Sequence, residues 1–174
     1  TVRNLVSLND LRAVDSGRIV GPKAAKLGEL HAIYPGHVSR GLAIPFGVFR
    51  QEVFEQHYPG GDGTVFEWMV ASYAELAQIP ADDPEQSEMT EAFREELYNI
   101  VLNTKYSQEF KDSLRAALEE NFGSDDLPGI FVRSDTNVED LAGFTGAGLN
   151  LTLPNVVGYE NLLEAIVRVW ASPF

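Results

Sequence analysis

Lys23 stands where a phosphate-binding cation would be useful, at the start of the segment GPKAAKLGEL (21–30). Apolar residues at helical spacing predict a helix from about residue 22 to residue 34. The N-terminus of a helix presents unpaired N–H groups and a partial positive charge, and a lysine there adds a mobile charge that reaches phosphate oxygens. The spacing differs from the GxxxxGK[ST] phosphate loop, so a solvated surface lysine is the alternative interpretation.

Arg133 is the second candidate, because it ends the apolar run IFVRS (130–134), which predicts a short strand. An arginine that follows three apolar residues is expected to be partly desolvated and therefore to need an anionic partner. Asp135, Glu139 or Asp140 could supply this partner within the chain and fix the loop. A phosphate held by the bidentate guanidinium is the other possibility, and the spacing alone leaves both open.

The third candidate is the glycine-rich segment AGFTGAG (142–148). Gly143, Gly146 and Gly148 permit positive φ angles and a close approach of the backbone to a ligand. Thr145 offers a hydroxyl, and successive N–H groups could line a phosphate oxygen. Glycine-rich loops also join strands without a chemical role, so the segment by itself does not decide between the two.

Metal ligation and histidine chemistry receive no candidates. The loop carboxylates of Asp135, Glu139 and Asp140 are of the kind that binds Mg²⁺, but loop acids more often form turns or face solvent, so we assign no metal ligand. The three histidines lie in separate segments, and no Ser/His/Asp arrangement is apparent. We assign none of the histidines a catalytic role.

The composition limits the classes of protein to which the chain can belong. Its 174 residues suit a single globular domain, and 26 acidic against 13 basic residues give a net charge of −13. This charge repels polyanions and argues against general nucleic-acid binding. The absence of cysteine excludes disulfides and thiolate metal sites, and no apolar run approaches the ~18 residues of a membrane span. We expect a cytoplasmic protein with no membrane partner.

The pattern of elements predicts an α+β fold with helices in the middle of the chain and strands toward both ends. Pro45 indicates that the apolar segment 41–49 is an edge or bent strand. We expect further strands at 130–134 and 149–153, and helices at 22–34, 51–57, 64–78, 89–102, 107–121 and from 161 onward.

Four blocks in this order resemble one known family: GPKAAKLGEL, GLAIPFGVF, VRSDTNVEDLAGFTGAG and LLEAIVRVWASPF. They are similar to the N-terminal nucleotide-binding region of phosphoenolpyruvate synthases and pyruvate phosphate dikinases, a family with relatives among glucan, water dikinases and rifampicin phosphotransferases. The blocks bracket nearly the whole chain, while residues 51–125 carry little recognisable motif. The VRS…ED…G block and the WAS ending are the most specific parts of the resemblance.

The resemblance implies an ATP-grasp-like N-terminal subdomain with a mixed or antiparallel sheet and a helical insertion in the middle. In this family ATP, with Mg²⁺, phosphorylates a histidine on a separate swivelling domain, which carries the phosphoryl group to an acceptor such as pyruvate. Lys23 matches the family's phosphate-contacting lysine, and Arg133 matches the arginine of its VRS motif. The glycine-bearing loop that closes over the phosphates corresponds to Gly143, Thr145, Gly146 and Gly148.

Two departures from the family pattern motivate an alternative function. Pro22 replaces the second glycine usual before the lysine, and Ala147 stands where many members have a glutamine. A non-catalytic nucleotide-binding or regulatory module is therefore the alternative to a phosphotransferase. The family's Mg²⁺ ligands, adenine-facing segment and phosphohistidine domain come from later in the chain. Residues 1–174, one domain, are thus expected to be a fragment of a longer multidomain chain and inactive alone, with an acceptor that the sequence does not identify.

Overall fold

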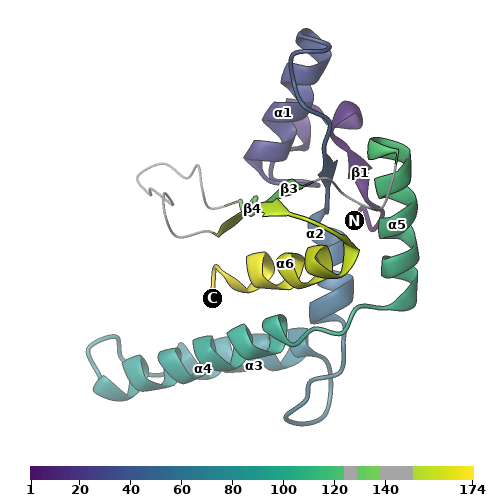
Figure 1. The fold of residues 1–174 in the computed structure, drawn as a ribbon. Helices are drawn as coiled ribbons and strands as arrows, with labels where there is room; N and C mark the ends of the chain where they lie inside the picture. Colours follow the sequence, from purple (N-terminus) through teal and green to yellow (C-terminus); the bar gives the residue numbers. More distant parts are fainter. Residues whose placement is uncertain (124–128, 138–150) are drawn as a thin grey trace.

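The computed structural model of the chain describes residues 1–123, 129–137 and 151–174. Helices make up most of this part, and the strands are short and lie toward the two ends of the sequence (Figure 1). In chain order the elements are β1 (Val6–Ser7), the 3-10 turns η1 (Leu8–Asp10) and η2 (Ala13–Asp15), α1 (Pro22–Ile33), β2 (Leu42–Ala43), α2 (Phe46–Phe49), the π-helical turn η3 (Arg50–Phe54), α3 (Val65–Leu76), α4 (Pro84–Leu102), α5 (Gln108–Phe122), β3 (Ile130–Arg133), β4 (Thr152–Val156) and α6 (Tyr159–Ala171).

The described strands form two antiparallel pairs. β1 pairs with β2, and β3 pairs with β4 in a register that places Val132 opposite Leu153 and Arg133 opposite Thr152. Alternate residues of a strand point to opposite faces, so Val132 packs against the core while Arg133 faces outward. The predicted α+β class is confirmed.

Helix α6 lies at the centre of the largest hydrophobic cluster. Its residues Leu162 and Ile166 are at most 4% exposed and pack with Leu114 of α5, while Val132 of β3 packs against the same cluster. Figure 1 shows α6 between the β3–β4 pair and α4, and it contacts both. Because each buried aliphatic side chain contributes about 1.5–3 kcal/mol, the strand that ends in Arg133 is anchored from one face.

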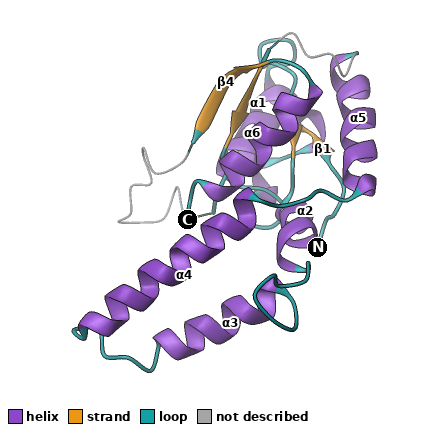
Figure 2. Ribbon diagram, turned by 60° about the horizontal axis from the view of Figure 1, so that its bottom comes forward, coloured by secondary structure: helices purple, strands orange, loops and turns teal. Residues whose placement is uncertain are grey.

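Helices α3 and α4 form an antiparallel pair that extends away from the rest of the described molecule (Figures 1 and 2). Trp68 of α3 packs on Phe93 of α4 and stacks on Tyr58. The hydroxyl of Tyr58 donates a hydrogen bond to Glu96, and this bond raises the pKa of Tyr58 to about 12. This pair is the helical insertion that was expected in the middle of the chain.

Several predicted boundaries differ from those of the structure: the strand expected at 149–153 is β4 at Thr152–Val156, and the helix expected at 51–57 is the turn η3 at Arg50–Phe54. A proline explains two further differences. Segment 41–49 is a strand only at Leu42–Ala43, because Pro45 becomes the N-cap of α2, where its missing N–H costs nothing. Helix α4 begins at Pro84 rather than at residue 89. Asp83 accepts a hydrogen bond from the N–H of Glu85, which caps the helix, and Pro84 occupies the first helical position.

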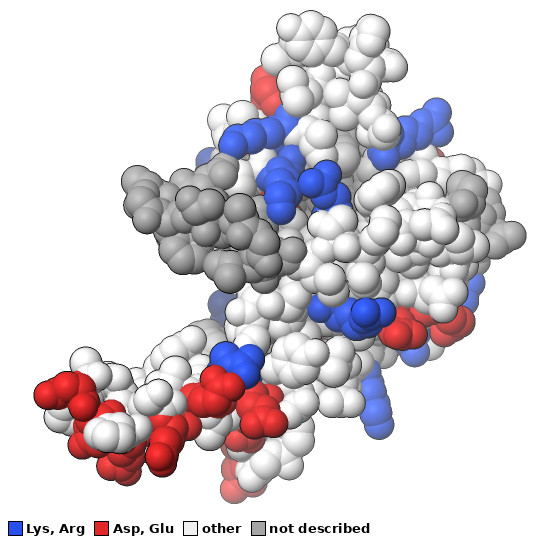
Figure 3. Space-filling view, turned by 60° about the vertical axis from the view of Figure 1, so that its left-hand side comes forward, with Lys and Arg blue, Asp and Glu red and all other residues white. Residues whose placement is uncertain are grey.

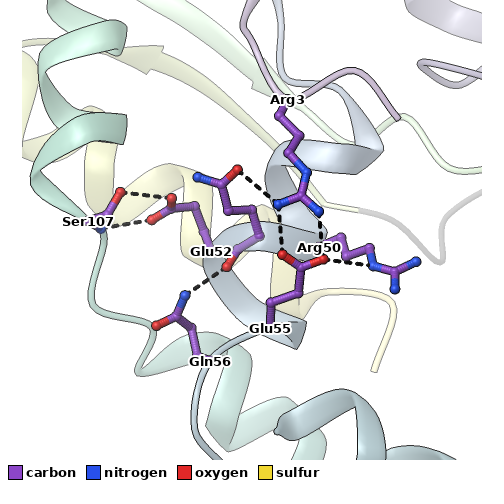
Figure 4. Close-up of polar contacts among 7 residues, drawn as sticks. Arg3, Arg50, Glu52, Glu55, Gln56 and Ser107 are labelled. Atoms are coloured by element: carbon purple, nitrogen blue, oxygen red, sulfur yellow. Dashed lines mark hydrogen bonds and ion pairs between the residues drawn. The ribbon is translucent and has the colours of Figure 1, made fainter.

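The buried carboxylate of Glu52 joins the π-helical turn η3 to the start of α5 (Figure 4). Glu52 is only 2% exposed, and its two oxygens accept hydrogen bonds from the backbone N–H of Ser107 at 2.7 Å and from the Ser107 hydroxyl at 2.8 Å. Nearby Glu55 joins the N-terminal segment to the end of η3, but its side chain is 33% exposed and pairs with Arg3 and Arg50. The two glutamates therefore differ in burial more than in the number of their partners.

Glu52→Ala is expected to lower the free energy of unfolding by about 2–4 kcal/mol, because the N–H and hydroxyl of Ser107 lose their buried acceptor. Urea unfolding followed by circular dichroism measures the loss. The matched control is Glu55→Ala, which breaks an exposed ion-pair cluster and should cost only about 0–1 kcal/mol. Equal losses in the two variants would contradict the structural role given to Glu52.

Candidate functional site

The N-terminus of α1 meets the segment that follows β3. The carboxylate of Asp135 accepts hydrogen bonds from the backbone N–H of Lys23 at 2.8 Å and from that of Ala24 at 3.0 Å. The side-chain Nζ of Lys23 donates to the backbone carbonyl of Ser134 at 3.1 Å. Lys23 therefore touches the two residues that directly follow Arg133, although 112 positions separate Lys23 from Asp135.

Pro22 explains why an acidic residue lies at this point. Proline has no N–H, so Lys23 and Ala24 carry the first backbone donors of α1. The N-cap residue, Gly21, has no side chain to accept from them. A carboxylate from a distant part of the chain does so, and its negative charge suits the positive end of the helix dipole.

Gly21 makes this close approach possible. A Cβ atom at this position would collide with the Asp135 carboxylate and would lie 2.6 Å from its Cγ and 2.7 Å from the backbone carbonyl carbon of Asp135. The φ angle of Gly21 is −78°, which any residue adopts, so the constraint is one of space and not of backbone conformation. Glycine is required here because two backbone segments pack against each other.

Strand β3 fixes the other side of the junction. The N–H of Ser134 donates to the carbonyl of Leu151 at 3.3 Å, which extends the hydrogen bonding between β3 and β4 by one residue. Ser134 is 5% exposed, and its carbonyl is the group that accepts from Lys23. The hydroxyl oxygen of Thr136, in the same segment, is buried and has no hydrogen-bond partner among residues 1–123, 129–137 and 151–174.

Arg133 is exposed, and the expectation that it is partly desolvated is wrong. Its side chain lies on the outward face of β3 with Phe131, which is 69% exposed, while Ile130 and Val132 pack inward. The alternation of the strand therefore overrides the apolar character of the preceding residues. An exposed guanidinium at the end of an anchored strand can bind a phosphate with two parallel hydrogen bonds.

Charge is strongly segregated along the chain. Ten acidic residues and one basic residue lie between Asp62 and Glu96, a net charge of −9, so the remainder of the chain carries −4. Figure 3 shows Asp and Glu crowded on the α3–α4 pair, and Lys and Arg gathered on the upper part of the molecule, where α1 lies. The net charge of −13 is therefore compatible with an anionic ligand near α1, because most of the negative charge is elsewhere.

The structure places Lys23 against the segment that follows Arg133, whereas several other predicted site residues are not among those it describes. Lys23 and Arg133 come from distant segments that meet through Ser134. The predicted loop residues Gly143, Thr145, Gly146 and Gly148 lie outside the described residues, as do Glu139 and Asp140. The sequence indicates Asp135 only as a partner of Arg133 or a metal ligand, and it does not predict the role of Asp135 as the cap of α1. The available signal was a helix start, Gly21-Pro22, that has no capping side chain of its own.

Among the described residues there is neither a group of metal-binding side chains nor a membrane-spanning helix. Within residues 1–123, 129–137 and 151–174, no three His, Cys, Asp or Glu side chains lie close enough together to hold a metal ion. Among the helices of these same ranges, none has both the length and the apolar character needed to cross a bilayer.

Comparison with known proteins identifies the family. The family model for the AMP/ATP-binding domain of pyruvate phosphate dikinase matches residues 17–174, and the chain therefore belongs to this family. The match includes α1 and β3, the two elements that form the junction described above. The resemblance seen in the sequence blocks is confirmed.

Curated relatives fall into two groups of enzymes. The chain is 29% identical over 167 residues to the rifampicin phosphotransferase of Streptomyces sviceus, which covers 95% of this chain and 17% of that protein. It is 26% identical over 174 residues to the phosphoenolpyruvate synthase of Escherichia coli K12, which covers 98% of this chain and 20% of the synthase. A probable phosphoenolpyruvate synthase of Pyrococcus abyssi is 30% identical over 176 residues, 88% of this chain and 21% of the relative. The chain thus spans about a fifth of the length of these relatives.

Gly21→Ala is expected to destabilise the protein by about 2–4 kcal/mol, because the new methyl group forces α1 away from residues 134–135. The thermal unfolding midpoint should fall accordingly. Gly61→Ala is the control: a Cβ there would meet only ring carbons of Tyr58 at 3.6 and 3.7 Å, an ordinary contact distance, and should change stability by less than about 0.5 kcal/mol. An unchanged midpoint for Gly21→Ala would show that the two segments are not packed as described.

Proposed function

We propose that this chain forms the phosphate-contacting part of an ATP site in a phosphotransferase of the phosphoenolpyruvate synthase and pyruvate phosphate dikinase type. One observation carries the proposal: Lys23 of α1 hydrogen-bonds the backbone carbonyl of Ser134, the residue that follows Arg133 of β3. Membership of a family defined by an AMP/ATP-binding domain supports the same ligand.

The two cations differ in chemistry and in mobility. Lys23 is a point charge on a flexible stem that starts from the first turn of a helix, and its contact with the Ser134 carbonyl orients the ammonium group. The guanidinium group of Arg133 is planar and offers two parallel N–H donors to one phosphate. Phosphoryl transfer needs mainly positioning and neutralisation of developing charge, and these two groups supply both.

The remaining parts of the reaction are assigned to other segments. The glycine loop with Gly143, Thr145, Gly146 and Gly148 is proposed to close over the phosphates within an ATP-grasp-like domain. The Mg²⁺ ligands, the histidine that accepts the phosphoryl group and its swivelling domain are proposed to lie outside residues 1–174 of a longer chain. These 174 residues alone would then bind nucleotide phosphates without completing the transfer.

The choice of the final acceptor is proposed to depend on domains outside residues 1–174. The relatives include enzymes named for rifampicin and enzymes named for phosphoenolpyruvate, and the phosphate junction described here is compatible with either. Transfer to pyruvate or to another small acceptor is therefore proposed only as a class: phosphorylation through a phosphohistidine. A nucleotide-binding module without catalysis is the second candidate, since the Asp135 carboxylate already satisfies the first N–H groups of α1.

Arg133→Ala in the full-length protein is expected to reduce ATP-dependent phosphoryl labelling by about a hundredfold, because the transferring phosphate loses a bidentate partner. Labelling with ATP radioactive in the β- and γ-phosphates measures the effect. Arg133→Lys keeps the positive charge but loses the two parallel N–H donors, so it should give an intermediate rate of labelling.

The control is Arg3→Ala, which removes another exposed arginine whose guanidinium is bound to Glu55. It should leave labelling unchanged. Full labelling by a folded Arg133→Ala protein would contradict the proposal, and tight ATP binding by a wild-type protein that is never labelled would favour the non-catalytic module.

A further inference from the structure

We propose that Asp135 is a positioning residue of the ATP site: it locks α1 to the end of β3 and so sets the relative placement of Lys23 and Arg133. This inference rests on the proposed function, because it concerns the same phosphate site. It further assigns the N–H groups of the first turn of α1 to an internal carboxylate. The side chains of Lys23 and Arg133, and not these backbone donors, then make the contacts with phosphate.

The hydrogen-bond geometry carries the first step. Two oxygens of one carboxylate bind two successive backbone N–H groups of α1 at 2.8 and 3.0 Å, which fixes both the position and the rotation of Asp135 relative to the helix. The third contact, from Lys23 Nζ to the Ser134 carbonyl, joins the same two segments through the lysine side chain. Three hydrogen bonds therefore connect residues 23–24 of α1 to residues 134–135.

The second step is independent of hydrogen bonding. Gly21 lies so close to Asp135 that a Cβ atom would be 2.7 Å from the backbone carbonyl carbon of Asp135. The backbone beyond β3 thus packs against the start of α1, and Ser134, at 5% exposure, is buried in this contact region. If the Asp135 carboxylate reached the helix from a distance, without backbone packing, a side chain at position 21 would be tolerated.

Charge repulsion and positioning predict opposite effects of removing Asp135 on the affinity for ATP. Asp135 brings a negative charge next to a site that is proposed to bind a polyanion, and simple Coulomb repulsion weakens such binding. If repulsion dominates, removal of Asp135 strengthens ATP binding. If positioning dominates, removal weakens it, because Lys23 and Arg133 no longer converge on the same phosphates. The two hydrogen bonds to α1 stabilise the carboxylate charge locally, so we expect positioning to dominate.

The experiment compares ATP with AMP, because positioned cations act on the phosphate chain and not on the nucleoside. Affinities are measured by calorimetry on the full-length protein for wild type, Asp135→Ala and Asp135→Asn. We expect about tenfold weaker ATP binding in Asp135→Ala and a smaller loss in Asp135→Asn, whose amide oxygen still accepts from one N–H. AMP affinity should stay within about twofold of wild type in both variants.

Asp83→Ala is the matched control, since Asp83 is also a carboxylate that caps a helix, α4, by accepting from the N–H of Glu85. It should lower the melting temperature without changing the affinity for either nucleotide. Should Asp135→Ala not fold, Asp135→Asn provides the same comparison with a side chain of nearly the same shape.

Each outcome decides a separate question. Unchanged or tighter ATP binding in the Asp135 variants overturns the positioning role and leaves the proposed function in place. Equal losses for ATP and AMP also overturn it, because they indicate a general structural defect. A wild-type protein that binds neither nucleotide contradicts the proposed function itself, and the inference fails with it.

Discussion

The contact between the Asp135 carboxylate and the first N–H groups of α1 is the interaction on which the candidate site depends. Helix N-termini need acceptors, and Pro22 and Gly21 leave α1 without one nearby in the sequence. The acceptor comes from beyond β3, so one local requirement of a helix becomes a long-range link. Under the proposal above, that link sets the positions of Lys23 and Arg133 relative to each other.

The hydrophobic core gives this link a rigid support. Helix α6 buries Leu162 and Ile166 against α5, and Val132 of β3 packs on the same cluster. The inward residues of β3 are thereby fixed, and its outward residues, including Arg133, are presented to solvent on a strand that cannot shift by one residue without burying the arginine. The core thus determines which face of the strand is available to a ligand.

The distribution of charge separates two regions of the molecule. The α3–α4 pair and its connections carry most of the negative charge, whereas the region of α1 gathers basic side chains (Figure 3). Exposed charges further apart than about 10 Å are largely screened at physiological salt, so the acidic helices do not prevent a phosphate from approaching α1. Net charge alone therefore says little about the ligand of this protein.

The sequence by itself determined the family, the α+β class and the order of the main elements. These features depend on local composition, apolar spacing and motif order, all of which can be read directly from the sequence. The tertiary structure decided the exposure of Arg133, the short strand before Pro45 and the role of Asp135 as the cap of α1. Those features depend on which face of a strand meets the core and on which distant group satisfies a helix end. The face of β3 is set by its packing on α5 and α6, and the helix cap joins residues that lie 112 positions apart.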